Sequence, residues 1–269
     1  MIAAQLRGDI LQMIPPGKVG HLGGSSSVVD ILAALYFSHM HVSSDPKDPA
    51  RDRCILSKGH AVLAQYACLA ELGYFDKEEF KRVKTLHGML QGHPDMDRTP
   101  GIEAVTGSLG QGLSVSLGMA LGLRLDGSPS RVYCIVGDGE LNEGQIWEAV
   151  MAASAFRADN LCAIIDRNLV QATDDVERVL PNGNLREKWA AFGWKPIEID
   201  GHDHHQILGA LDEAKATRGK PAVLIANTVK GKGFPFAEGK AQFHNAALNE
   251  EQYALALDAV ETMKREAER

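Results

Sequence analysis

Residues Arg131 to Gln171 read RVYCIVGDGELNEGQIWEAVMAASAFRADNLCAIIDRNLVQ and carry the clearest signals of secondary structure in the chain. An apolar run at 132–136 is rich in β-branched residues and ends at Gly137-Asp138-Gly139, which is typical of a buried parallel strand followed by a tight turn. Apolar residues then recur at helical spacing across 143–156, and a second apolar run follows at 161–165. The pattern predicts a strand–helix–strand unit.

Polar residues stand at the carboxyl end of both predicted strands. Asp138 offers a carboxylate after the first strand, Asn168 offers an amide oxygen after the second, and the loop beyond Asn168 offers backbone carbonyls. Open parallel sheets bind ligands outside these strand ends, and Mg²⁺ takes about six oxygens, several of them from a bound phosphate. The glycine-rich turn adds N–H groups for phosphate charge. A Gly-Asp-Gly alone is common at turns, but its combination with Asn168 about thirty residues later predicts a magnesium diphosphate site.

The rest of the chain repeats the alternation of strands and helices. Further strands are expected at 54–56, 196–199 and 222–226. Helices are expected at 2–13, 28–39, 61–72, 76–86, 113–125, 205–217 and 250–267, with a short one that closes at 189–194. Irregular segments are expected at 87–106, 170–184 and 228–244. This order predicts the α/β fold class, with a parallel sheet flanked by helices in a single domain spanning 1–269.

Composition narrows the classes of function. The chain has 269 residues, a formal net charge of −7 and 45% hydrophobic residues, as in an ordinary globular protein without the basic excess of a general nucleic-acid or membrane-surface binder. Its four cysteines form no CxxC pair, its N-terminus is amphipathic rather than signal-like, and no apolar run approaches the roughly 18 residues of a membrane span. A cytoplasmic protein is expected.

Four of the ten histidines directly follow a glycine, namely His21, His60, His93 and His202. Glycine lets a loop present the imidazole, which exchanges protons near neutral pH. The first three are expected to converge on one cleft, although any one alone could be a surface or capping histidine. A zinc site at residues 202–205 is a competing interpretation, disfavoured because no thiolate or glutamate partner lies at helical spacing.

These motifs resemble those of a known family. A Gly-Asp-Gly followed two to three dozen residues later by Asn is similar to the motif of thiamine-diphosphate enzymes, and the surrounding GDGELNEGQIWEA narrows the resemblance to the transketolase family. The glycine-rich TGSLGQG at 106–112 and the early Gly-His loops support it. The resemblance implies the diphosphate-binding (PP) domain of that family, with thiamine diphosphate and Mg²⁺, or Ca²⁺ or Mn²⁺ as substitutes.

The resemblance also implies roles for individual residues. The implied metal ligands are Asp138, Asn168 and the carbonyl of Val170. The implied cofactor contacts are His60, Gly107, Ser108, Leu109, Gly139, Asn168 and His244. The implied substrate contacts are His21, His93 and His244, of which His21 and His244 are the catalytic residues. Glu143 is implied at a subunit contact near the cofactor.

By resemblance, the activity is transfer of a two-carbon ketol unit from a ketose phosphate to an aldose or aldose phosphate, as in the pentose phosphate pathway. The family's pyrimidine-binding and C-terminal domains match no segment here. The resemblance therefore implies a partner chain that carries them, in an α₂β₂ heterotetramer. The sequence departs from the family pattern at Arg167, at Gln171-Ala172-Thr173, at Leu22 after His21 and at Asn245 after His244. These departures affect the expected identity of the substrates more than the expected binding of the cofactor.

Three other functions remain open on the sequence. One is another thiamine-diphosphate reaction, as in a deoxyxylulose-phosphate synthase or a keto-acid dehydrogenase component. Another is a non-catalytic scaffold subunit, which the retained Asp138 and Asn168 disfavour. A third is dinucleotide binding, but no GxGxxG opens a first strand–helix turn.

Overall fold

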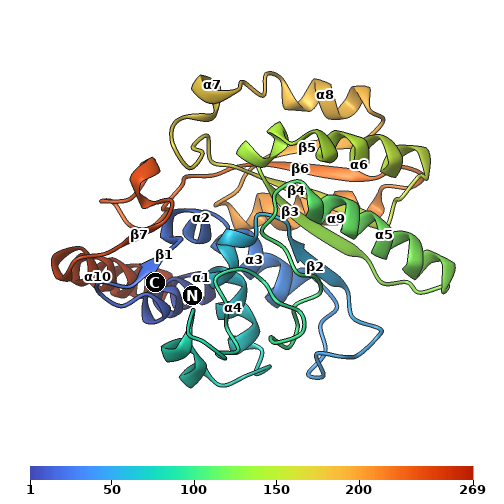
Figure 1. Cartoon of the computed structure of the whole chain (residues 1–269). Helices are drawn as coiled ribbons and strands as arrows, with labels where there is room; N and C mark the ends of the chain where they lie inside the picture. The colour runs from blue at the N-terminus through green and yellow to red at the C-terminus, as the bar shows by residue number, and fades with distance from the viewer. Residues whose placement is uncertain (269) are drawn as a thin grey trace.

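The computed structural model describes residues 1–268. Its centre is a sheet of five parallel strands in the order β2-β3-β4-β6-β5 (Figure 1). The strands are β2 (Arg53–Leu56), β3 (Val132–Gly137), β4 (Leu161–Arg167), β5 (Lys195–Asp200) and β6 (Ala222–Asn227). The α/β fold class with a parallel sheet flanked by helices is confirmed. Each predicted strand is present, with ends displaced by no more than two residues.

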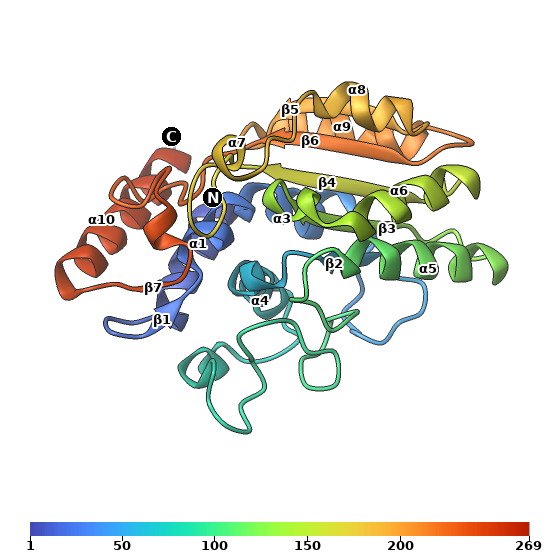
Figure 2. The same cartoon turned by 45° about the horizontal axis from the view of Figure 1, so that its top comes forward.

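The two faces of the sheet are covered by different helices. One face carries α1 (Ile2–Met13), α3 (Val29–Ala34), α4 (Val62–Glu71) and α9 (His204–Ala216), and α10 (Glu250–Ala267) packs outside α1. The other face carries α5 (Gln111–Leu125), α6 (Gly144–Ala155) and α8 (Leu185–Ala191). Figure 2 shows α5 and α6 lying side by side on their layer. Because both faces are covered, the strands are continuously apolar rather than alternating.

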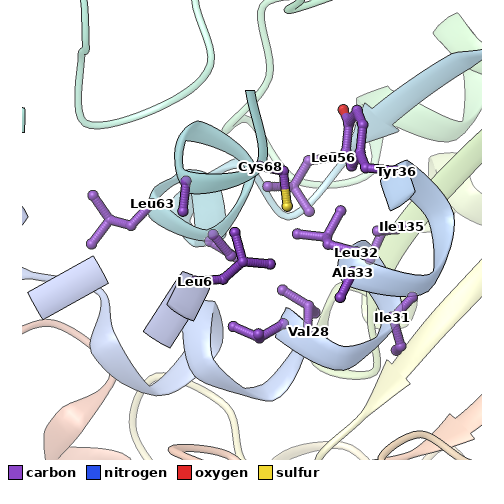
Figure 3. Packing of buried hydrophobic residues seen from close by; sticks show 14 of the residues in the cluster. Leu6, Val28, Ile31, Leu32, Ala33, Tyr36, Leu56, Leu63, Cys68 and Ile135 are labelled. Atoms are coloured by element: carbon purple, nitrogen blue, oxygen red, sulfur yellow. The ribbon is translucent and has the colours of Figure 1, made fainter. Parts of the chain in front are cut away.

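Alternate side chains of β3 and β4 enter the two cores. Tyr133 and Ile135 point into the core beneath α1, α3 and α4, whereas Val132, Cys134 and Val136 point toward α5 and α6. In the first core, Leu6, Val28 and Leu32 come together from two helices (Figure 3). These cores hold the ends of β3 and β4 at one edge of the sheet, with Gly137 opposite Asp166 in the register.

Two predicted helices differ in the structure. The helix expected at 28–39 begins earlier, as α2 (Leu22–Ser27), and continues through α3 into a π-helical turn at Leu35–His39. The glycines and serines of α2 lie before the expected helix, but α2 is buried, and the Ser26 hydroxyl donates to the Leu22 carbonyl at 2.7 Å. Packing therefore outweighs the low helix propensity of glycine and serine.

The helix expected at 76–86 is reduced to a 3₁₀ segment at Lys77–Arg82. Lys84 and His87 have φ angles of 59° and 62°, in the left-handed region that an α-helix cannot include. A residue pattern does not reveal where such conformations occur. The sequence also gave no indication of α7 (Val176–Val179) or of the small antiparallel ladder between β1 (Val19–Gly20) and β7 (Ala246–Ala247).

Within residues 1–268, none of the helices combines the length and the apolar character that crossing a bilayer requires.

The central strands should dominate stability. Ile164 is fully buried in β4, whereas Leu125 at the end of α5 is 88% exposed. We expect Ile164→Ala to lower the free energy of unfolding by about 2–5 kcal/mol, because it removes buried methyl groups and leaves a cavity. The matched change Leu125→Ala should alter it by less than about 0.5 kcal/mol. Denaturant unfolding of both variants measures the difference, and equal effects would contradict the assignment of the core.

Candidate functional site

A cavity of about 510 Å³ opens at the carboxyl ends of β3 and β4. It is lined from β3 by Gly137, Asp138 and Gly139, and from the segment after β4 by Asn168 and Val170. The oxygen-bearing residues predicted to share a site are therefore brought together. The remaining lining residues are Lys58, His60, Leu109, Glu140, Asn142, Glu143, Gln171, Ala172, Val179, Leu180, Lys230 and His244.

The Asp138 carboxylate is buried and held by backbone donors. Its Oδ1 accepts from the Gly139 N–H at 2.8 Å, and its Oδ2 accepts from the Leu169 N–H at 2.5 Å. Leu169 adopts a left-handed φ of 65°, which is uncommon for a branched residue. Burial, together with the negative charge of Asp166, raises the pKa of Asp138 to about 6.

Asn168 is oriented by Asp166. The Asn168 Nδ2 donates to Asp166 Oδ2 at 2.8 Å, and its Oδ1 accepts from the Val170 N–H at 3.2 Å. The Val170 carbonyl in turn accepts from the Lys230 ammonium at 2.8 Å, so a cation already lies against this oxygen. A carboxylate, an amide oxygen and a carbonyl that faces a cation around one cavity fit the oxygen ligands of Mg²⁺.

Asp166 is a residue whose importance the sequence reasoning missed. It is fully buried and accepts from Ser27 Oγ at 2.7 Å, from Lys58 Nζ and from the Thr228 hydroxyl. Burial disfavours its charge, but the Lys58 ammonium and these hydrogen bonds outweigh burial, so the pKa of Asp166 lies below its ordinary value. Its place in the polar Asp166-Arg167-Asn168 end of β4 was the available signal.

Glu140 is a second missed residue, and it joins the glycine-rich loop to the tip of β3. Its Oε1 accepts from Ser57 Oγ at 2.5 Å and from the Gly110 N–H at 2.9 Å, and its Oε2 accepts from the Gly137 N–H at 3.0 Å. Burial raises the pKa of this carboxyl. These hydrogen bonds of Glu140 fix the position of residues 107–110 beside the cavity.

Within that loop, Leu109 lines the cavity, whereas Gly107 packs on His93. Gly107 has a φ of 134°, and a Cβ there would lie 2.6 Å from the His93 ring, so only glycine fits. Ser108 is exposed beside them. Glu143 is exposed at the rim, where it precedes the first turn of α6.

Four imidazoles from distant parts of the chain meet at this end of the sheet. The ring centroid of His21 lies 5.4 Å from that of His60, 5.9 Å from that of His93 and 5.5 Å from that of His244. The rings of His60 and His244 are 4.7 Å apart. The three early Gly-His loops therefore converge as predicted, although only His60 of the three lines the cavity.

The cluster is uncharged at neutral pH. Burial, with the Lys84 ammonium and the neighbouring imidazoles, lowers the pKa of His21 to about 3. Burial followed by the charge of Lys230 lowers the pKa of His244 to about 4, and burial also lowers the pKa of His60 and of His93. Neutral imidazoles can accept a proton or a hydrogen bond as well as donate one.

The positive charge of the site comes from two lysines that the sequence reasoning did not single out. Lys58 is buried between the Gly24 carbonyl, at 3.0 Å, and Asp166. Lys230 is buried against the Val170 carbonyl, and its Nζ lies 3.1 Å from His244 Nδ1. Burial, with the charge of Lys58, lowers the pKa of Lys230 to about 8. Each lysine adjoins a glycine in a strand-end loop, which was the available signal.

The histidines at 202–205 have different partners. His202 Nδ1 lies 2.7 Å from Asp30 Oδ2, His204 Nε2 lies 3.8 Å from Asp30 Oδ1, and His205 is exposed. Within residues 1–268, no three side chains of His, Cys, Asp or Glu are arranged to hold a metal ion. The competing zinc interpretation therefore gains no support.

Comparison with known proteins agrees with this geometry. Residues 2–262 match the family model described as transketolase, thiamine diphosphate binding domain. The 6-deoxy-6-sulfo-D-fructose transketolase subunit SqwG of Clostridium sp. (strain MSTE9) is 47% identical over 244 residues, covering 90% of this chain and 89% of that protein. An apulose-4-phosphate transketolase subunit of Phocaeicola vulgatus is 40% identical over 255 residues, covering 94% of this chain and 90% of that protein.

Solved structures show the same relationship. The transketolase of Campylobacter jejuni superposes with a TM-score of 0.85 at 33% identity, covering 96% of this chain and 41% of that one. This chain thus spans about two fifths of the solved enzyme. With the family model, the relatives and the structural match in agreement, the chain belongs to the transketolase family, as a member of its thiamine-diphosphate-binding domain.

Proposed function

We propose that the chain binds thiamine diphosphate and Mg²⁺ in the cavity at the ends of β3 and β4. The observation that carries this proposal is that Asp138, Asn168 and Val170, which bring a carboxylate, an amide oxygen and a backbone carbonyl, line one cavity. These three groups would hold the metal. Asp166 fixes the orientation of the Asn168 amide through the bond to its Nδ2, so the Oδ1 atom is kept available.

The same cavity suits the diphosphate. Lys58 and Lys230 contribute ammonium groups to its wall, which offset phosphate charge without a basic excess over the whole chain. A Cβ on Gly139 would lie 2.8 Å from the Gln171 side chain, so the turn at Gly139 leaves no room for a larger residue. Leu109 and His60 form the part of the wall where the less polar body of the cofactor would lie.

The reaction proposed is transfer of a two-carbon ketol unit from a ketose phosphate to an aldose. When bound, thiamine diphosphate supplies the carbon nucleophile and the electron sink that this chemistry needs. The chain supplies proton transfer: His21 and His244, kept neutral by burial and nearby cations, can accept protons from sugar hydroxyls and return them. His93 and His60 lie within the same imidazole cluster, where hydroxyl groups of the sugar can be bound.

A partner chain completes the site in this proposal. The chain spans 41% of the solved transketolase, and its relatives are named as transketolase subunits. Apolar side chains are exposed around the cavity, with Leu109 at 36%, Leu169 at 44%, Val179 at 48% and Leu180 at 53%. A chain carrying the pyrimidine-binding and C-terminal domains would cover them, with Glu143 at the contact, in an α₂β₂ assembly.

The proposed substrate is a ketose with an anionic group at its far end. The two relatives described above are named for a sulfonated ketose and for a sugar phosphate. The complex with the partner should release a two-carbon-shortened aldose from a ketose phosphate or sulfonated ketose when an aldose acceptor is present. Liquid chromatography with mass spectrometry measures this product. Decarboxylation of pyruvate instead of ketol transfer would contradict the transketolase assignment.

Removal of the carboxylate of Asp138 should weaken the Mg²⁺-dependent binding of thiamine diphosphate. We expect Asp138→Asn to raise the Kd for thiamine diphosphate in the presence of Mg²⁺ by more than about tenfold, because a charged metal ligand is lost. Asp174→Asn changes a carboxylate in the loop after Asn168 whose side chain is half exposed and does not line the cavity, so it is the matched control and should bind as wild type. Isothermal titration with and without the partner gives both values. If wild-type protein shows no Mg²⁺-dependent binding in either case, the proposed function is wrong.

The proton-transfer role requires a neutral His21. We expect the imidazole of His21 to remain uncharged at pH 5 in an NMR titration, because its pKa is lowered to about 3. Lys84→Met removes a positive charge that disfavours protonation, so it should raise the pKa of His21. Lys81→Met, which removes an exposed lysine paired with Glu78, serves as the control. A wild-type His21 that titrates near its ordinary value would contradict the proposed environment.

A further inference from the structure

His202 belongs to the fourth Gly-His pair of the sequence but lies outside the cavity. Its imidazole is mostly buried and makes two bonds. Nδ1 lies 2.7 Å from Asp30 Oδ2, and Nε2 accepts from the Val229 N–H at 2.9 Å. Because a backbone N–H can only donate, Nε2 must be unprotonated, and the ring proton therefore lies on Nδ1, toward the Asp30 carboxylate.

Asp30 connects this histidine to the first helix. Its carboxylate accepts from Arg7 Nη1 at 3.2 Å and from Nη2 at 2.8 Å, and all three side chains are largely buried. Arg7 Nε donates to the Lys232 carbonyl at 3.0 Å. The Arg7–Asp30–His202 network therefore hydrogen-bonds to the backbone of the loop after β6 at two points, the Val229 N–H and the Lys232 carbonyl.

Lys230 lies between these two points. Its side chain is buried and passes beside Gly23, where an added Cβ would lie 3.1 Å from Lys230 Cγ. The ammonium ends 2.8 Å from the Val170 carbonyl. A lysine has a flexible four-carbon stem, so its ammonium is placed accurately only if its backbone is fixed and its stem is enclosed.

We propose that His202 is a positioning residue for the diphosphate-binding cation Lys230. By accepting from the Val229 N–H, the imidazole fixes the backbone immediately before Lys230 and so holds the ammonium at the diphosphate subsite. His202 reaches this loop from the turn between β5 and α9, a part of the chain that contributes no residue to the cavity wall. The inference rests on the proposed function, since it assumes that the cavity receives a diphosphate.

Two amide substitutions test the two hydrogen bonds of the His202 imidazole one at a time. Glutamine carries its amide oxygen about as far along the side chain as Nε2, so His202→Gln retains an acceptor for Val229. Asparagine reaches only as far as Nδ1, so His202→Asn retains a donor for Asp30 and loses the bond to Val229. His205→Asn changes an exposed histidine in the first turn of α9 and is the matched control.

The experiment is isothermal titration of thiamine diphosphate, with Mg²⁺, into each variant assembled with its partner subunit. We expect His202→Asn to raise the Kd roughly three- to tenfold, the amount that one hydrogen bond is worth. The Kd values of His202→Gln and His205→Asn should stay within about twofold of the wild-type value. At saturating cofactor, kcat should be retained in His202→Asn while the KM for the cofactor rises, which a general loss of folded protein would not produce.

Other results would overturn the inference. Equal weakening in both amide variants, or wild-type affinity in His202→Asn, would show that the acceptor bond does not position Lys230. A measurement on the unaltered protein tests the same point without substitution: nitrogen-15 NMR should find the His202 ring protonated at Nδ1 and not at Nε2 at pH 7. A proton on Nε2 would overturn the assignment. Failure of the proposed function is distinguishable, because wild-type protein itself would then not bind the cofactor.

Discussion

The site depends on one buried carboxylate, that of Asp166. It receives hydrogen bonds from Ser27 of α2, Lys58 after β2, Asn168 after β4 and Thr228 after β6. A buried carboxylate is strongly destabilising unless hydrogen-bond donors surround it. The fold must therefore bring these four segments together around Asp166. The Asn168 amide, Lys58 and the loop that carries Lys230 are thereby assembled around the cavity by a residue that does not line it.

The cavity contains buried cations that the net charge of the whole chain does not indicate. The chain has a formal net charge of −7, and its cavity wall places the cations Lys58 and Lys230 and two imidazoles beside three carboxylates. An anionic ligand would therefore be attracted by a few enclosed groups rather than by the surface. A neutral imidazole also has an unprotonated nitrogen that can accept a hydrogen bond or a proton, which a charged imidazole lacks.

The sequence predicted the centre of the fold well because its signals there are local. Continuous apolar runs define β3 and β4, and glycine marks the turn after β3, so the relative placement of Asp138 and Asn168 followed from topology alone. The convergence of His21, His60 and His93 was also predictable, since each follows glycine in an early loop. The roles of these residues toward cofactor and sugar stay predictions.

The rest depends on contacts between distant parts of the chain. Glu140, Lys58 and Lys230 acquire their importance from burial and from partners dozens of residues away, which spacing does not encode. The helix expected at 76–86 is not formed in full because Lys84 adopts a left-handed conformation, in which its N–H donates to the Leu90 carbonyl at 2.9 Å. The start of α2 was missed because its glycines and serines have low helix propensity but are buried.

The contact between the Lys230 ammonium and the Val170 carbonyl has a consequence for assembly. Asp138 and Asp166 bring two carboxylates into a confined region, and the tethered ammoniums of Lys58 and Lys230 stand within their electrostatic range. The ammonium groups of Lys58 and Lys230 therefore offset part of the repulsion between the Asp138 and Asp166 carboxylates. The pocket can accordingly keep its shape through groups of the chain itself, unlike small metallodomains whose ligands order only on metal binding.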